Sequence, residues 1–105
     1  MDNADRLYDV KITKAAWEQM LGHARFLAHV SADAANRLVD EFLEKTSTLR
    51  QMPERCPWLA HETILHQKYR KVFFGKFHVA LFEVRGSTVF IVAVVDCRQD
   101  YGWLL

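Results

Sequence analysis

Residues 69–95, which read YRKVFFGKFHVALFEVRGSTVFIVAVV, decide the fold of this chain. The stretch divides into three runs rich in β-branched and aromatic residues, as strands are: Tyr69 to Phe74, His78 to Val84, and Thr88 to Val95. Short connections containing Gly75 and Gly86 separate them, and connections of this length form hairpins. Three strands joined in this way must pair antiparallel.

The last run predicts its own place in the sheet. It is apolar at every position from Val89 to Val95, which is typical of a strand that is buried on both faces. We therefore expect it to lie centrally. Polar residues follow at once, from Asp96 through Arg98 to Asp100. Polar groups held at the end of a rigid strand favour recognition or catalysis.

Two helices and a short strand are predicted upstream. Tyr8 to Ile12 alternates apolar and polar residues, which indicates a strand with one buried face. Thr13 is a suitable N-cap for a helix from about Lys14 to Val30. The apolar residues of this helix recur at three- and four-residue spacing: Trp17, Met20, Leu21, Ala24, Leu27 and Ala28.

A second helix, capped by Ser31 or Asp33, is predicted to continue until Pro53 stops it. Its apolar stripe consists of Ala35, Leu38, Val39, Phe42, Leu49 and Met52. The short connection makes the two helices an antiparallel hairpin, which must bury its stripe against one sheet face. We predict an α+β fold of order β-α-α-β-β-β in one domain, residues 1–105. The first strand should lie beside the last or at the far edge, and the sheet face without helices should be available for function.

Composition narrows the class of protein. The 105 residues are half apolar, and 14 Lys and Arg balance 13 Asp and Glu, so net charge argues neither for nor against a nucleic-acid partner. No apolar run reaches the length of a membrane helix, and the N-terminal residues lack the apolar core of a signal peptide, so we expect a cytoplasmic protein without membrane contact. Cys56 and Cys97 are expected to be reduced packing residues.

Residues 66–78, HQKYRKVFFGKFH, concentrate basic side chains: Lys68, Arg70, Lys71 and Lys76, with no acid among them. Lys68 and Arg70 should share a strand face, and Arg98 at the end of a neighbouring strand should lie close to them. Metal-independent RNA cleavage needs a base, an acid and cations on the phosphate, and this set fits it in part. A solvated face or a docking surface for an acidic partner fits the same residues. His61, His66 and Glu62 lack a further ligand at a recognisable spacing, so no metal or other cofactor is expected.

The order of elements resembles that of the RelE/ParE superfamily of bacterial toxins. The segments VSADAANRLVDEF (30–42) and LRQMPERCPWLAHE (49–62), the strands of residues 69–95 and the polar stop after them carry the resemblance. The ParE-like branch is the more similar one. It writes Phe-Pro-Tyr where this chain has Phe-His-Val at 77–79, and His-x-Arg-Arg-Asp where this chain has Asp-Cys-Arg-Gln-Asp at 96–100. Arg70, Phe77, Arg98 and Asp100 match that branch, whereas His78, Val79, Asp96 and Gln99 depart from it.

This resemblance implies the toxin of a type II toxin-antitoxin (plasmid stabilisation) system, bound and neutralised by a cognate antitoxin in a hetero-oligomer. The ParE-like branch implies an inhibitor of DNA gyrase, which is the interpretation we favour. The RelE-like branch implies instead an endonuclease that cleaves mRNA on the ribosome. A degenerate, non-toxic member that only binds its antitoxin is a third interpretation, so whether the protein is an enzyme stays open.

The resemblance also implies candidate site residues. RelE-like nucleases place basic residues on the second strand, an arginine on the third, another after the fourth, and a tyrosine near the C-terminus. The corresponding catalytic candidates here are Arg70, His78 and Arg98, with Lys68 and Tyr101 as additions. A binding protein would use a wider set for its target or antitoxin: Lys68, Arg70, Lys71, Arg98, Asp100, Tyr101 and Trp103. A structural interpretation of the same residues pairs Arg98 with Asp100 or places Asp100 against Arg70.

Overall fold

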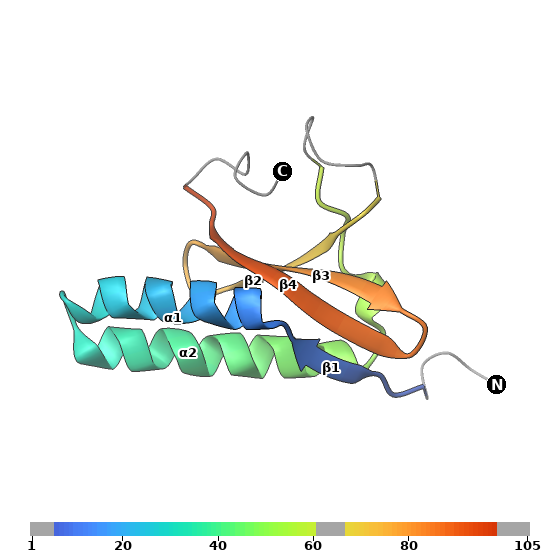
Figure 1. Ribbon diagram of the computed structural model, residues 1–105, viewed down its shortest axis with the longest axis horizontal. Coiled ribbons are helices and arrows are strands. Elements are labelled where there is room, and N and C mark those ends of the chain that lie inside the picture. Colours follow the sequence, from blue (N-terminus) through green and yellow to red (C-terminus); the bar gives the residue numbers. More distant parts are fainter. Residues whose placement is uncertain (1–5, 61–66, 99–105) are drawn as a thin grey trace.

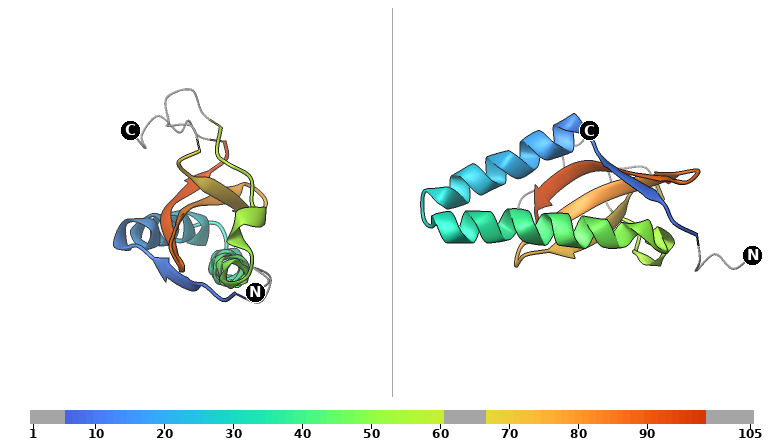
Figure 2. Two further views of the ribbon diagram at one scale, coloured as in Figure 1. Left: turned by 90° about the vertical axis from the view of Figure 1, so that its right-hand side faces the viewer. Right: turned by 90° about the horizontal axis from the view of Figure 1, so that it is seen from below.

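The computed structural model describes residues 6–60 and 67–98 and has two layers. The elements, in chain order, are β1 (Asp9–Ile12), α1 (Lys14–Ala28), α2 (Ala32–Ser47), the short 3-10 helices η2 (Thr48–Arg50) and η3 (Pro53–Arg55), β2 (Arg70–Phe74), β3 (His78–Arg85) and β4 (Thr88–Asp96). The α1–α2 hairpin covers one face of the sheet (Figures 1 and 2). The predicted α+β class and the order β-α-α-β-β-β are confirmed.

The sheet has the order β1-β4-β3-β2, so β4 lies in its interior as predicted. β1 pairs with β4 in parallel, and β3 pairs antiparallel with both β4 and β2. Of the two positions considered for the first strand, the one beside the last strand is correct. The predicted strand at Tyr69 begins one residue later, at Arg70.

A β-bulge divides β4 into two halves. Phe82 of β3 lies opposite Ile91 and Leu81 lies opposite Ala93, so Val92 is the extra residue. The ladder between β1 and β4 ends at the pair Ile12 and Ile91, just before the bulge. The second half of β4 therefore continues without β1 as a neighbour.

Side-chain caps begin both helices as the sequence predicts. The hydroxyl of Thr13 accepts a hydrogen bond from the amide of Ala16 at 3.2 Å, and Ser31 accepts one from Ala34 at 3.1 Å. The inward stripes of the two helices bury Met20, Leu38 and Phe42 against the sheet. Phe42 meets Phe74 of β2 with ring centroids 5.3 Å apart.

The second helix ends earlier than predicted, at Ser47 rather than at Pro53. Hydroxyls of three consecutive residues donate to carbonyls of the last turns: Thr46 to Phe42 at 2.8 Å, Ser47 to Glu44 at 2.6 Å, and Thr48 to Lys45 at 2.6 Å. Such bonds compete with continuation of the helix. Leu49 is still buried, but Met52 has a φ of 49° and is 49% exposed, so its assignment to the buried stripe is wrong. The first helix likewise ends at Ala28 rather than at Val30.

The sheet face opposite the helices, here called the outer face, holds a second core. Leu59, Val79, Leu81, Ala93 and Val95 form this cluster, and each is at most 4% exposed. The segment around Leu59 is held to the start of β2, because the amide of Leu59 donates to Tyr69 O at 2.7 Å and the amide of Lys71 donates to Pro57 O at 3.0 Å. Among the described residues no helix covers the outer face, but its centre is packed, so the expectation that this face is available for function is wrong there.

The two cysteines differ in their environment. Cys56 is buried, as a packing residue should be, whereas Cys97 is exposed. Within residues 6–60 and 67–98, no helix combines the length and apolar character that a membrane crossing requires.

Candidate functional site

Arg70 ties a loop to the sheet. It is the first residue of β2, and its guanidinium lies 3.7 Å from the centre of the Trp58 ring. Its Nη1 donates to the carbonyl oxygens of Glu54 at 3.0 Å and Cys56 at 2.7 Å. The side chain thus binds the backbone within η3 and just after it, and the guanidinium is partly engaged by these contacts.

Lys68 does not share a strand with Arg70. It lies in a bend before β2 begins, with its ammonium 5.2 Å from the centre of the Tyr69 ring. The expectation that Lys68 and Arg70 lie two apart on one strand face is therefore wrong. Lys71 does lie on β2, with its ammonium 5.6 Å from the centre of the Phe73 ring.

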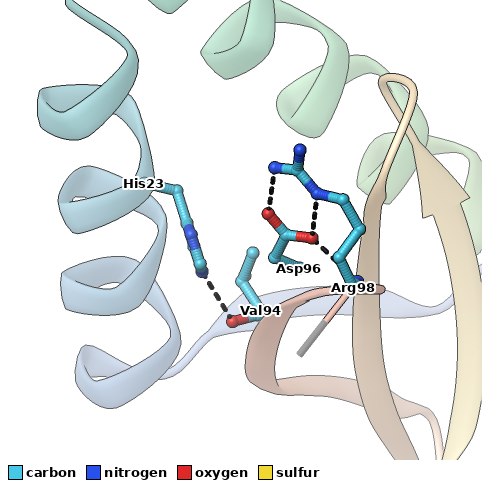
Figure 3. A network of polar contacts seen from close by, with 4 residues as sticks. All are labelled: His23, Val94, Asp96 and Arg98. Carbon is cyan, nitrogen blue, oxygen red and sulfur yellow. Dashed lines mark hydrogen bonds and ion pairs between the residues drawn. The ribbon is translucent and has the colours of Figure 1, made fainter. Parts of the chain in front are cut away.

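Arg98 makes a bidentate ion pair with Asp96 at the end of β4 (Figure 3). Nη2 donates to Oδ2 at 2.6 Å and Nε donates to Oδ1 at 3.0 Å, while the backbone amide of Arg98 donates to Oδ1 at 2.9 Å. The guanidinium also lies 4.4 Å from the centre of the Phe77 ring. This planar fork is the geometry in which arginine binds carboxylate most specifically.

The pair sits at a boundary between core and solvent. The Arg98 side chain is 63% exposed, and that of Asp96 is only 11% exposed. Hydrogen bonds from Arg98 outweigh burial and hold the pKa of Asp96 at about 2. The same bonds raise the pKa of Arg98. Asp96 therefore stays ionised and fixes the arginine at the rim.

Side chains of α1 take the place that β1 leaves vacant beside the second half of β4. Gln19 Oε1 accepts a hydrogen bond from the amide of Val94 at 2.8 Å. His23 Nε2 lies 3.2 Å from Val94 O and donates to it (Figure 3). Residues four apart on a helix lie on one face, so one helix turn satisfies both backbone groups of Val94. This clamp holds the strand end that carries Asp96.

His78 begins β3 opposite Phe74 and Asp96, and its side chain faces the helices. Its ring makes an edge contact with His23 at 5.1 Å and a tilted contact with Phe74 at 5.5 Å, both between centroids. Burial lowers the pKa of His78, electrostatic interactions with His23 and Arg98 lower it further, and Asp96 opposes them. This environment favours the neutral imidazole.

The structure brings some candidates together and separates others. His78, Asp96 and Arg98 meet at one end of the sheet. Arg70 lies at the other end of β2, four residue steps from Phe74, which is about 13 Å at ~3.3 Å per residue. The expected proximity of Arg70 and Arg98 is wrong, because the hairpin register places the end of β2, not its start, beside His78. Asp100, Tyr101 and Trp103 lie outside the described residues.

A cleft of about 430 Å³ opens beside this end of the sheet. Both helices and the β2–β3 turn line it, through Leu27, Ala34, Arg37, Leu38, Glu41, Gly75, Lys76, Phe77, His78 and Arg98. Sequence reasoning missed the clamp and the cleft. One signal was visible for the clamp: Gln19 and His23 are polar residues near Met20 on the inward side of the helix, which is otherwise apolar.

The two-layer arrangement, with an N-terminal strand and a helical hairpin packed on a mixed four-stranded sheet, is that of the RelE/ParE toxin fold. A family model described as "ParE toxin of type II toxin-antitoxin system, parDE" matches residues 10–101, and the chain belongs to this family. The predicted superfamily and branch are confirmed.

Solved structures agree on the fold. A chain from the "Chromosomal ParDE TA system from P. aeruginosa" superposes with a TM-score of 0.70 over 88% of this chain and 98% of that chain, at 16% sequence identity. Comparison with curated protein sequences gives no match. This protein is thus a toxin of a type II toxin-antitoxin system.

Proposed function

We propose that this toxin acts by binding a protein target, DNA gyrase, rather than by cutting RNA, and that a cognate antitoxin neutralises it. The observation that carries the proposal is the engagement of the two arginines that a nuclease would need. Arg98 is paired with Asp96, and Arg70 is bound to loop carbonyls at the other end of β2.

Cleavage of RNA requires cations, a base and an acid around a single phosphate. His78 is the one candidate base among the predicted residues, and it turns toward His23 and Phe74 under the helices. The nearest candidate cation, Arg98, already faces a carboxylate. A phosphate near His78 would meet the charge of Asp96 as well as that of Arg98, which disfavours the nuclease.

Exposed aromatic side chains support binding as the mode of action. Phe73 is 55% exposed, Phe77 is 44% exposed, and each carries a cation over its ring, from Lys71 and Arg98 respectively. Large apolar groups beside positive charge suit a macromolecular partner. The toxin would encounter both gyrase and the antitoxin in the cytoplasm, which is the compartment expected from the sequence.

The test is induction of the toxin in a bacterial host, with plasmid supercoiling and mRNA integrity measured in parallel. We expect growth arrest with loss of supercoiling and without cleavage within codons. Ribosome-dependent cleavage with normal supercoiling would establish the alternative endonuclease. A folded protein that arrests nothing would establish the non-toxic interpretation.

Arg98 supplies the matched variants for the same experiment. Arg98→Lys keeps the charge but loses the fork, and we expect it to lose toxicity as Arg98→Ala does. Arg85→Ala is the control, because Arg85 pairs with Glu83 at the opposite end of β3. Full toxicity of a folded Arg98→Ala variant would remove Arg98 from the binding site.

A further inference from the structure

A surface at the far end of the sheet from Arg98 combines exposed apolar side chains with cations. At this end β3 turns into β4, β2 begins, and the segment of η2 and η3 pairs with the residues that precede β1. Figure 1 shows the β3–β4 turn at the opposite end of the molecule from the tip of the helical hairpin. This surface is therefore separate from the end of the sheet that carries His78 and Arg98.

Two hollows of about 440 and 590 Å³ lie side by side on this surface, because Glu54 lines both of them. Each hollow contains one large apolar side chain that is open to solvent. Met52 lines the first and is 49% exposed, and Trp58 lines the second and is 37% exposed. The cations of the two linings are Arg6, Arg55, Lys68 and Arg70, and the acids are Glu54 and Glu83.

Met52 has a backbone conformation that folding alone would assign to another residue. Its φ of 49° and ψ of 54° lie in the left-handed region, which glycine and asparagine adopt most readily. A methionine in this conformation costs backbone energy, and its half-exposed side chain recovers little of that energy by burial. Strain of this kind is concentrated at functional sites. A contact with a partner explains the exposed methionine better than the fold does.

Arginines hold the segments that carry both apolar side chains. Arg55 Nη1 donates to the carbonyl oxygens of Gln51 at 2.8 Å and Met52 at 3.2 Å, which fixes the strained turn. The guanidinium of Arg70 lies 3.7 Å from the centre of the Trp58 ring and donates to two carbonyls of the adjoining loop. Because these groups are already ordered, a partner would bind them with a small loss of conformational entropy.

The mixture of charges favours a protein partner over a nucleic acid. Glu54 lies between the hollows and Glu83 lines the second, so a continuous chain of phosphates would meet carboxylates along its path. Arg6 and Lys68 offer cations at separate points, 4.8 and 5.2 Å from the centres of tyrosine rings. Exposed methionine and tryptophan side chains beside arginine are the composition of the centre of a protein–protein interface.

We propose that this surface is a contact site for the protein target of the toxin, and that it receives a segment with acidic side chains next to apolar ones. The acidic side chains meet Arg6 and Lys68, and the apolar ones cover Met52 and Trp58. The inference rests on the proposed function, in which the target is DNA gyrase. It adds a second region of contact, apart from Arg98.

The first arm of the test replaces Met52 by asparagine, which is polar and adopts the left-handed conformation readily. Purified toxin is titrated against purified gyrase, and both affinity and inhibition of supercoiling are measured. Met52→Asn should weaken both about tenfold or more, as for loss of an interface anchor, while its melting temperature stays at or above that of the unaltered protein. Phe26→Asn is the control, because Phe26 is 78% exposed on α1 and lines neither hollow, and it should change affinity less than about threefold.

The second arm reverses a charge of the second hollow. Lys68→Glu should weaken binding about tenfold or more and reduce its dependence on salt, because an attractive cation becomes a repulsive anion. Arg25→Glu, at an exposed position on α1 outside both linings, is the control and should have little effect. Lys68 is itself exposed, so Lys68→Glu should keep its melting temperature, and it decides the question if Met52→Asn does not fold.

The outcomes separate this surface from the proposed function. Equal binding of gyrase by the unaltered toxin and both variants would overturn the surface and leave the target standing. An unaltered toxin that neither binds nor inhibits gyrase would overturn the proposed target and this contact with it. Binding to duplex DNA without gyrase, lost in Lys68→Glu, would make a nucleic acid the occupant and overturn the protein contact. A melting temperature of Met52→Asn far below that of the unaltered protein would make Met52 a folding residue and remove it from the surface.

Discussion

At the scale of single residues, Asp96 explains how a charged pair is maintained at the end of an apolar strand. Its carboxylate accepts from the side chain and the backbone of Arg98, so little of its hydrogen-bonding capacity is lost on burial. The ParE-like branch has histidine at this position. No sequence pattern indicated that Asp96 would form an ion pair with Arg98, two residues later. The predicted partner of Arg98 was Asp100, which lies outside the described residues.

The Asp96 carboxylate makes stability depend on pH in a defined range. Its pKa in the folded protein, about 2, is below its ordinary value of 3.8. The stabilisation is therefore fully present above about pH 4 and is lost as pH falls toward 2. Urea unfolding should give the unaltered protein a higher free energy of unfolding than Asp96→Asn at pH 5, and this difference should shrink as the pH falls to 2. Asp40→Asn, at an exposed position, is the control, and a difference that does not change with pH would contradict the pairing.

His78 should titrate below its ordinary value of 6.5, because burial opposes its charged form. A folded-state pKa that is lowered means that the neutral imidazole stabilises the fold, so this contribution is complete above about pH 6.5 and falls as the ring protonates. NMR titration of the imidazole resonance tests the first statement. The expected companion result is that His78→Gln loses less stability than the unaltered protein between pH 7 and pH 5. A pKa above 6.5 would place His78 in solvent or beside a dominant anion.

At the scale of elements, α1 does more than cover the sheet. Gln19 and His23 bind the amide and the carbonyl of Val94 where β1 has ended, which fixes the second half of β4 after its bulge. Periodicity predicted the helix and its buried face. It did not predict the clamp, because the clamp depends on a bulge at Val92 that shifts the pairing of β4 with β3, and on side chains of α1 that are distant from Val94 in the sequence.

Removal of either clamp residue should destabilise the strand end selectively. Gln19→Ala and His23→Ala each leave one backbone group of Val94 without its partner, at a cost of about 1–3 kcal/mol. The Val94 amide should also exchange faster with deuterium in Gln19→Ala. Glu18→Ala, on the exposed side of the same helix, tests whether the effect is helix propensity alone. Unchanged exchange at Val94 in a folded Gln19→Ala variant would show that the clamp does not hold the strand.

At the scale of the whole molecule, local patterns predicted the order of elements and the interior position of β4, because each run of residues carries its own periodicity. The gathering of site residues was predicted less well. Arg70 and Arg98 were expected together, but antiparallel pairing brings Phe74, His78 and Asp96 to one end and sends Arg70 to the other. The partner of Arg70, Trp58, comes from a loop whose pairing with β2 has no short-range sequence signal.

The surface of the whole molecule indicates how an antitoxin would bind. The exposed aromatic rings of Phe73 and Phe77, with Lys71 and Arg98 beside them, favour an acidic and apolar segment that is disordered alone and folds on the toxin. Such binding should bury roughly 1,000–3,000 Å² and give a large negative heat-capacity change. Calorimetry at several temperatures and salt concentrations measures both properties, and circular dichroism of the free antitoxin tests its disorder. A segment that is already folded alone, with an affinity indifferent to salt, would contradict a charged surface that orders its partner.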